Sequence, residues 1–586
     1  MDETQRRLAE ELIFTEKKKY GFAKQLFFGT FDNPSIFPFP APNREERERS
    51  NAFEEKVEAF ACERIDAAAI DQQADIPPAV LQGLAQLGVF GMTIPTDFGG
   101  LGMSQYAYCR VTELLARRCC STALLVNAHQ SIGLKALLLF GTEEQKKQWL
   151  PPLARGEHLA AFSLTEPNAG SDASGIETRA TWDEEKKVWR LNGRKQWTTN
   201  GSIAQVLTVM AKTTIATARG MEDKVTAFLV TPDMPGFSIT AAALNKVGMR
   251  GTHTSNIALD NVAVPESHIL GPLGAGLRVC LTVLDYGRTT FGALCTGVAK
   301  ALVAEAFAHA ITRHQFQRPL ASFALVKKKL ATMSALAYAM ESTTYLTAGF
   351  IDNGTEDIML EAAILKIFTS EALWYIIYET MQIFGGRSFF NDLPYERAMR
   401  DARLNMIGEG ANEVLRAFVG LVGMREIGLE LKGLRDGWRS WPPPLCISAS
   451  FFWNKLFLSP FGATAAPLQN PSHALSKALR RFFLSLVKLL GCYGEGIIEK
   501  QLALDRIATS AIALYTSSAV LSRLEGNLDG NKRCEKELVA GLHFCHIALH
   551  DLDTALSGIF SPLDTASEKA ADALLSLYKA DMGGHG

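Results

Sequence analysis

The chain of 586 residues is too long for one hydrophobic core, so about two to four domains are expected. Apolar residues make up 47% and charged residues 21%, which excludes a disordered chain and is typical of a globular protein. Lys and Arg number 60 against 62 Asp and Glu, and the formal net charge of -2 excludes a global field that would attract nucleic acid.

The ten cysteines are scattered, and none forms the two-residue spacing of a zinc knuckle, which is typical of a reducing compartment. Residues 1–20 mix charges and have neither the apolar core of a signal peptide nor the Arg- and Ser-rich, acid-poor character of a transit peptide. We therefore expect a cytoplasmic protein, or one whose presequence was removed before numbering. No run of about 18 uninterrupted apolar residues predicts a spanning helix.

Residues 1–44 are basic and aromatic and then rich in proline, so they predict a short helix followed by an extended N-terminal arm. From 45 to 158 the apolar residues recur at helical spacing, as in Ala79–Phe90, and glycines interrupt the pattern near residue 100. This spacing predicts an N-terminal helical domain.

The apolar period changes to two between residues 159 and 271. The runs 206–210 and 226–230 predict buried strands, and Asn192–Gly193 predicts a hairpin turn. This segment is therefore expected to form a middle β-domain, as a sheet or barrel.

Long apolar helices return in residues 272–432, as in Val298–Phe307, and predict a C-terminal helical bundle. The order helix, sheet, helix segregates the two classes and favours an α+β fold over a wound parallel sheet. After Lys432 the prolines of Gly437–Pro444 indicate a stiff linker. Residues 433–586 are then expected to form an extra helical domain.

Glu409 stands between two glycines just before an apolar helical run. Glycine lets the backbone approach a ligand closely, and Asn412 has the side chain of a helix cap. Taken alone, this segment is more often a solvated turn. Its functional alternative is a site for a proton-abstracting base.

Two segments of the expected β-domain suit a polar, planar ligand. Phe162–Asp172 ends a strand in small and hydroxyl residues, and Lys195–Gly201 sets the indole of Trp197 beside hydroxyls. Each segment alone is more often a β-turn or a core tryptophan. Their occurrence together favours a binding site.

At these residues the chain resembles the acyl-CoA dehydrogenases, the FAD-dependent flavoproteins of fatty-acid β-oxidation, over about residues 50 to 430. The family-like stretches are Gly141–Lys146, Phe162–Asp172, Trp197–Gly201, Gly248–Thr252, Arg313–Phe316, Gln382–Gly386 and Glu409–Gly410. The arm and residues 433–586 resemble the very-long-chain branch, including its mitochondrial paralogue associated with respiratory complex I assembly. An acyl-CoA dehydrogenase-like fold with a four-helix bundle and an extra C-terminal helical domain is implied.

The resemblance implies that Glu409 takes the α-proton of an acyl thioester while a β-hydride passes to the flavin, giving a trans-2-enoyl-CoA. Electrons would go on to electron-transferring flavoprotein. The FAD contacts that it implies are Phe162, Leu164, Thr165, Gly170, Ser171, Trp197, Thr198, Thr199, Arg313, Phe316, Gln382, Gly385, Gly386, Ala411 and Glu413. The acyl-CoA contacts that it implies are Ser171, Asp285, Arg288 and Gly410. No metal is expected.

Arg313, Phe316 and residues 382–386 would meet FAD largely from a neighbouring subunit, so the resemblance implies a homo-oligomer, with a dimer expected. Judged by residue type alone, Glu166, Asp172 and Glu413 are structural or surface carboxylates, and Arg288 is ambiguous.

The chain departs from the family pattern at several positions. Ala411 stands where threonine is usual, Gln317 replaces a common glycine, and Ala324 replaces a glutamine, which would weaken contacts to the cofactor. Of two glycines that open the acyl-pocket floor in the very-long-chain branch, Gly133 is kept and Ala136 fills the other place. We expect a preference for long acyl chains.

The aromatic stretch Phe451–Phe457 and the basic amphipathic segment around Arg480 suit a peripheral membrane contact, with packing against the dehydrogenase core as an even alternative. His543, His546 and His550 share a helix face, where surface positions are more frequent than metal ligands.

Three functions remain open from sequence: a long-chain acyl-CoA dehydrogenase, an acyl-CoA oxidase that passes electrons to oxygen, and a scaffold for respiratory-complex assembly. For a bacterial protein the expected location is the cytoplasm, including the inner face of the membrane. For a mitochondrial protein it is the inner membrane or matrix.

Overall fold

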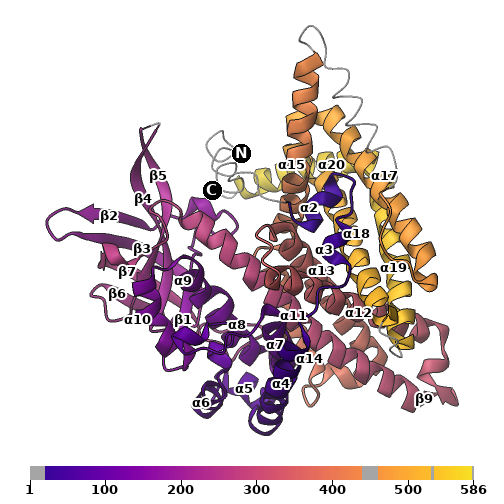
Figure 1. Cartoon of the computed structure of the whole chain (residues 1–586), viewed down its shortest axis with the longest axis horizontal. Coiled ribbons are helices and arrows are strands. Elements are labelled where there is room, and N and C mark those ends of the chain that lie inside the picture. Colours follow the sequence, from indigo (N-terminus) through magenta and orange to yellow (C-terminus); the bar gives the residue numbers. More distant parts are fainter. Residues whose placement is uncertain (1–19, 219, 439–458, 530–533, 584–586) are drawn as a thin grey trace. The chain divides into compact units, whose positions relative to one another are not determined.

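The computed structural model describes residues 20–218, 220–438, 459–529 and 534–583 (Figure 1). The chain divides into two units, one made of residues 1–21 with 39–412 and the other of residues 22–38 with 413–586.

The first unit begins with helices, as the sequence predicts. Their caps are set by local chemistry: Asn43 accepts the N–H of Glu46 at the start of one helix, and Thr142 with Gln145 forms a capping box at another. The helices are α4 Arg44–Arg64, α5 Ala67–Gln73, α6 Pro78–Gln86, α7 Gln105–Arg118, α8 Cys120–Asn127, η3 Ala128–Gly133, α9 Leu134–Phe140 and α10 Glu143–Ala154. In η3 the chain forms a π-helical turn, a feature that often marks a functional segment.

A β-sheet of eight strands follows. Its order is β6-β7-β3-β2-β4-β5-β8, and β1 pairs in parallel with β4. The bounds are β1 Ala160–Ser163, β2 Arg179–Asp183, β3 Val188–Thr199, β4 Val206–Thr217, β5 Gly220–Val230, β6 Phe237–Ala241, β7 Thr254–Pro265 and β8 Ile269–Leu270. The predicted buried runs 206–210 and 226–230 are confirmed in β4 and β5, because side chains on both sheet faces lie in apolar clusters.

The hairpin predicted at Asn192–Gly193 is wrong. Both residues lie inside β3, where the pairing with β7 shifts its register, and the turn into β3 lies between Asp183 and Val188. A Cβ atom at Gly193 would stand 2.7 Å from the Cα of Thr178, so glycine is required by a close backbone approach rather than by a turn.

Three long helices complete the unit: α11 Gly276–Thr312, α12 Ala324–Asp352 and α13 Met359–Phe384. A small hairpin of β9 His314–Gln315 and β10 Arg318–Pro319 joins the first two, and α14 Tyr395–Arg403 follows the third. Cys120–Phe140 and α11 are long and apolar enough to cross a membrane, but most of each is buried in the fold, as in core helices of globular proteins.

The second unit contains α2 Phe22–Phe27, α3 Asn33–Ile36, most of α15 Asn412–Trp438, and then α17 Gln469–Tyr493, α18 Gln501–Asp529, α19 Glu535–Ser557 and α20 Pro562–Gly583. Helix α2 agrees with the short helix expected before residue 44, whereas the extended conformation expected after it is wrong at Asn33–Ile36, which form α3. Phe27 packs edge-on against Phe482 at 5.2 Å between ring centroids, and Phe31 and Phe37 pack on Phe461. Burial of these rings packs the segment onto the helices of the second unit.

Of the two alternatives for the segment around Arg480, the structure favours packing of its apolar side, and the peripheral membrane contact stays a prediction. Leu475, Leu479 and Phe482 of α17 are buried within the second unit, and Arg481 pairs with Asp553 of α19. The apolar stripe is used for packing against neighbouring helices of this unit. The stretch 451–457 and residues 439–444 of the expected linker lie outside the described residues, whereas Gly437 and Trp438, expected to begin that linker, belong to α15.

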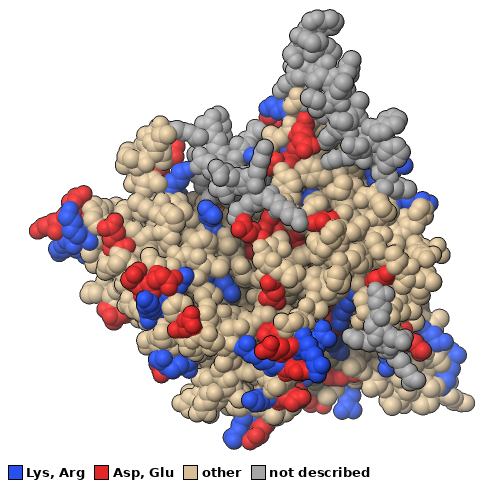
Figure 2. Space-filling view, viewed as in Figure 1, with Lys and Arg blue, Asp and Glu red and all other residues tan. Residues whose placement is uncertain are grey.

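On the face drawn in Figure 2, lysine and arginine side chains lie among aspartate and glutamate side chains. This mixture agrees with the near-zero net charge. Among the described residues no group of three His, Cys, Asp or Glu side chains is placed to hold a metal ion.

Candidate active site

Glu409 lies in the loop between α14 and α15, with φ of 60°, and the following Gly410 has φ of 96°. The carboxylate oxygen Oε2 is buried and has no hydrogen-bond partner. It lies against α11 and η3: a Cβ atom added to Gly287 would stand 2.7 Å from this oxygen and 2.9 Å from Cγ2 of Ile132. A glycine at 287 is therefore what leaves room for the carboxylate.

The electrostatics of this carboxylate have two opposed parts. Burial raises the pKa of Glu409, while the charges of Arg288 and Lys366 lower it, and the net shift is upward. A carboxylate with raised proton affinity and an unoccupied lone pair has the properties of a general base.

Two cations bind the backbone of the loop. Arg288 Nε donates to the carbonyl of Glu409 at 3.2 Å, and Lys366 Nζ donates to the carbonyl of Gly410 at 2.7 Å. Arg288 also pairs with Asp285, at 3.0 Å between Nη1 and Oδ1, and both side chains are buried. Burial raises the pKa of Asp285 to about 7, against the effect of Arg288.

Of the residues expected to contact acyl-CoA, the structure thus brings Asp285, Arg288 and Gly410 together around Glu409. Ser171 is instead exposed in the loop after β1. Next to it, Asp172 accepts the N–H groups of Ser174 and Gly175, which is the cap role expected from its residue type.

The two segments expected to hold the flavin lie side by side. Ser163 and Thr198 share a hydrogen bond of 2.8 Å between their hydroxyls, and the Gln196 N–H donates to the Thr165 carbonyl at 2.9 Å. The pairing of β3 with β7 is interrupted between Lys195 and Thr198. In this bulge Trp197 takes φ of 58° and its side chain is 60% exposed.

We call the surface formed by Phe162–Ser171 and Trp197–Thr199 the cradle. Its other residues differ in exposure. Phe162 is buried in β1, Leu164 is partly buried, and Thr199 pairs with Thr254 of β7. Gly170 is exposed, and an added Cβ there would meet nothing within 4 Å. The exposed face of the Trp197 indole is a surface on which a planar ring system fits.

An ion pair under the cradle was missed from sequence. Lys195 Nζ lies 2.6 Å from Glu166 Oε1 and donates to the Leu164 carbonyl at 3.0 Å, with the two side chains 0% and 2% exposed. Glu166 also accepts the backbone N–H groups of Glu177 and Thr178. Burial lowers the pKa of Lys195 to about 8. Charged residues in strands are usually solvent-facing, so the sequence offered no signal for this pair.

The cradle and the base are linked through η3. Gly133 packs against β1, where an added Cβ would lie 2.8 Å from the Ala160 carbonyl oxygen, and the preceding Ile132 touches the Glu409 side of α11. Cys280 of α11 is close enough to both Glu409 and Lys195 for their charges to affect the pKa of its thiol. Gly133 therefore serves a close backbone contact with β1, and its expected role at the acyl-pocket floor stays a prediction. Ala136 is fully buried in the adjoining core.

The third group of expected FAD contacts lies elsewhere. At about 1.5 Å per residue, the 26 residues of chain from Gly287 to Arg313 place this arginine roughly 39 Å from Gly287, the residue of α11 that lies against the base. Phe316, in the hairpin beyond it, has φ of 52° and is 89% exposed. Gln317 is also exposed, and Ala324 begins α12.

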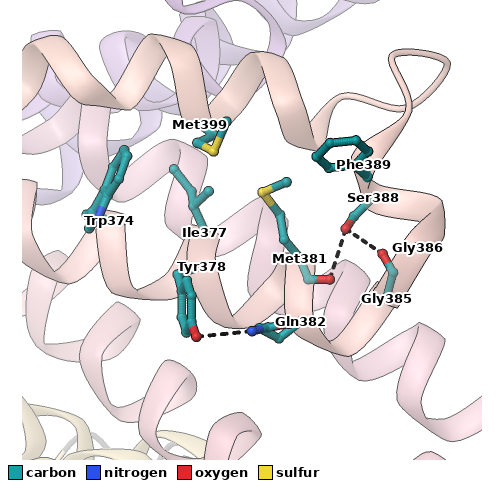
Figure 3. Close-up of a pocket in the computed structure, with 10 residues that line it drawn as sticks. All are labelled: Trp374, Ile377, Tyr378, Met381, Gln382, Gly385, Gly386, Ser388, Phe389 and Met399. Carbon is teal, nitrogen blue, oxygen red and sulfur yellow. Dashed lines mark hydrogen bonds between the residues drawn. The ribbon is translucent and has the colours of Figure 1, made fainter.

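Gln382, Gly385 and Gly386 border a surface pocket of about 460 Å³ at the end of α13 (Figure 3). Ser388 closes the turn beneath it by donating to the carbonyls of Met381 and Gly385. The other residues that line the pocket are Trp374, Ile377, Tyr378, Phe389 and Met399. The structure does not bring this group together with the base of the same chain.

Ala411 and Glu413 follow the base, and Glu413 is exposed in the first turn of α15. Ala411 supplies no hydroxyl, so the contact that threonine would offer at this place is absent from the residue itself.

Four family models match the chain in order. They are the acyl-CoA dehydrogenase N-terminal domain at residues 47–157, its middle domain at 161–262, its C-terminal domain at 274–422, and the ACAD9/ACADV C-terminal domain at 466–575. The human mitochondrial very long-chain specific acyl-CoA dehydrogenase is 35% identical over 528 residues, which are 88% of this chain and 80% of that protein.

Two solved structures show the same fold. An acyl-CoA dehydrogenase from Bacillus anthracis complexed with FAD has a TM-score of 0.77 and 28% identity, and the match covers 93% of this chain and 92% of that one. Butyryl-CoA dehydrogenase from Megasphaera elsdenii has a TM-score of 0.61 and 31% identity, covering 66% of this chain and 99% of that one.

Proposed function

Because the chain belongs to the acyl-CoA dehydrogenase family, with a C-terminal region of the ACAD9/ACADV type, we propose that Glu409 is the base of its α,β-dehydrogenation of long-chain acyl-CoA. The chain is an oxidoreductase, and FAD is its cofactor. The observation that carries the proposal is the buried, unpartnered Oε2 of Glu409. This oxygen lies beside Ile132 of η3, and the next residue of η3, Gly133, packs against β1, the strand that leads into the cradle.

The residues of the cradle fit a flavin. Trp197 offers an exposed face, and Thr165 and Thr198 lie beside it with backbone and hydroxyl groups. When bound, FAD supplies the acceptor for the β-hydride. Glu409 takes the α-proton on Oε2, and its raised pKa increases the driving force for that transfer. Arg288 and Lys366 keep enough of the carboxylate ionised for it to act as a base.

The acyl-length preference is tested by anaerobic bleaching of the bound flavin with acyl-CoAs of graded length. Palmitoyl-CoA is expected to reduce the flavin with a second-order rate constant about tenfold or more above that of butyryl-CoA, since each additional buried methylene stabilises the complex. Stopped-flow absorbance at the flavin band gives both rates. Faster bleaching by butyryl-CoA would mean a short pocket like that expected of a butyryl-CoA enzyme, with the dehydrogenase chemistry intact.

We further propose electron-transferring flavoprotein as the electron acceptor, as the resemblance implies. The oxidase alternative predicts hydrogen peroxide in equal amount to enoyl-CoA in air. Absence of peroxide, together with turnover by an artificial acceptor under argon, favours the dehydrogenase. The presence of Glu409 disfavours a purely non-catalytic scaffold for respiratory-complex assembly. The domain boundaries at residues 44, 158, 271 and 432, and the cytoplasmic or mitochondrial location, stay predictions.

A homo-oligomer that completes the FAD site follows from the distribution of expected contacts. Arg313, Phe316 and the pocket at Gln382 are far from the base of their own chain along the helices, and this surface exposes Phe389 to 81%. Large exposed aromatic side chains around an apolar pocket are typical of an interface.

Phe389→Ser is therefore expected to weaken self-association roughly thirtyfold, or about 2 kcal/mol, and to lower the flavin content of the purified protein. Sedimentation velocity over a concentration series and the flavin-to-protein absorbance ratio measure the two effects. Leu575→Ser, which removes an exposed apolar side chain of α20, is the matched control. Equal association constants for the two variants would show that this surface is not part of the subunit interface.

A further inference from the structure

Lys366 of α13 is a fully buried lysine that the sequence analysis did not single out. Its ammonium donates to the carbonyl of Gly410 at 2.7 Å and to Oδ1 of Asn412 at 2.8 Å. Burying an ammonium is unfavourable by several kcal/mol unless its donors are satisfied. A lysine kept at this place is therefore expected to have a specific use.

The loop that Lys366 binds is one that needs support. Glu409 is not a glycine, yet it has φ of 60°, in the left-handed region that costs a side-chain-bearing residue roughly 1–2 kcal/mol. Gly410 continues with φ of 96°. Such a conformation persists only when the surroundings hold it. The two consecutive carbonyls of this turn are bound by Arg288 and Lys366.

Lys366 is itself part of a larger anchor on α13. Asn412, which accepts from Lys366, donates through Nδ2 to Ser370 at 3.0 Å and to Glu371 at 3.1 Å. The residue after the turn is thus tied to the same helix, one helical turn beyond Lys366. Lys366 connects both ends of the turn to α13.

We propose that Lys366 is a positioning residue for Glu409: it fixes the left-handed turn through Gly410 and Asn412 and sets how readily the carboxylate takes a proton. This rests on the proposed role of Glu409 as the base. Lys366 lies away from the atoms that react, so it acts through the base and not on the substrate.

The charge of Lys366 acts on Glu409 in a definite direction. The groups that face Glu409 are the cations Arg288 and Lys366, together with Tyr108 of α7 and Cys280 of α11, whose pKa values are raised by burial so that both are neutral. Lys366 in turn faces Glu409, Arg288, Cys295 and Glu371. Burial lowers the pKa of Lys366 to about 8, so at neutral pH it is mostly protonated. Removing it removes one of two charges that favour ionised Glu409.

The test is Lys366→Met, which keeps an unbranched side chain one atom shorter than lysine and deletes the charge and the donors. Loss of the cation raises the pKa of Glu409, so the acidic limb of the pH profile for flavin reduction moves to higher pH, by about one unit. The plateau rate falls about tenfold or more because the carboxylate is less well placed. With an α-deuterated acyl-CoA, the kinetic isotope effect rises as proton abstraction becomes slower.

Lys366→Arg keeps the charge while placing its donors differently, and provides a second variant if the Lys366→Met protein does not fold. Its plateau rate should fall while its acidic limb stays near that of the wild type. Lys300→Met removes an ammonium that pairs with Glu113 and Glu341, away from the base, and is the matched control. Its pH profile should not move.

A wild-type acidic limb and isotope effect in Lys366→Met would overturn the positioning role. Glu409→Gln measured in parallel separates the two proposals. If that variant still reduces flavin, the base assignment fails; if it is inactive while Lys366→Met behaves as the wild type, only the role of Lys366 fails.

Discussion

Glu409→Gln is expected to lower the rate of flavin reduction by acyl-CoA by about 10³-fold or more, the largest effect of any single change in this chain. The amide has nearly the shape of the carboxylate and retains one acceptor oxygen, but it is too weakly basic to take the α-proton. The buried Oε2 atom has no protein partner whose loss would disturb the fold, so the variant should keep its stability. Flavin content and thermal unfolding should match the wild type.

Stopped-flow bleaching with a saturating long-chain acyl-CoA measures this effect. Glu185→Gln, an exposed carboxylate in the turn between β2 and β3, is the control and should react at the wild-type rate. Bleaching of Glu409→Gln at a rate within about threefold of the wild-type rate would require another base. Among the described residues of the first unit, no other carboxylate has a buried oxygen without a hydrogen-bond partner.

Lys195→Met is expected to lower the free energy of unfolding by about 3–5 kcal/mol, since it leaves the Glu166 carboxylate buried without its cation. It also releases the Leu164 carbonyl, one of the backbone groups of the cradle. The purified variant should therefore contain less FAD than the wild type. Urea denaturation followed by far-UV circular dichroism measures the stability, and the flavin absorbance measures the occupancy.

Two controls separate charge from general damage. Lys187→Met breaks an exposed pair with Glu184 and should cost less than about 1 kcal/mol. The double variant Lys195→Met with Glu166→Leu removes both charges and should recover part of the stability lost by the single change, because the carboxylate is no longer stranded. If Lys195→Met and Lys187→Met had equal free energies of unfolding, the buried pair would contribute no more stability than the exposed one.

The sequence predicted the parts of the fold that depend on local periodicity. Helical spacing in residues 45–158 and 272–432, and the apolar runs of β4 and β5, are confirmed because neighbouring residues determine which face of an element is apolar. Asn192–Gly193 shows where this reasoning fails. A turn-forming dipeptide was placed inside β3 because the close approach of Thr178 needs a residue without a side chain.

The C-terminal region shows the same limit. The amphipathic pattern of α17 was visible in the sequence, but the pattern states only that one side is apolar and not what covers it. Burial of Leu479 and Phe482 in the second unit, with Phe27 from near the N-terminus packed on the latter, depends on residues more than 400 positions apart. Contacts of that kind leave no local signature.

The sequence by itself determined the α+β class, the flavin-holding segments as candidates and Glu409 as a candidate base, because ordered motifs and residue types are written in the chain. Only the tertiary structure decided which groups surround the base. Gly287 and Ile132 make its space, Arg288 and Lys366 bind its turn, and the pair Lys195–Glu166 lies under the cradle. These residues come from separate elements, and a buried charge is recognisable only when the partner that compensates it is in place.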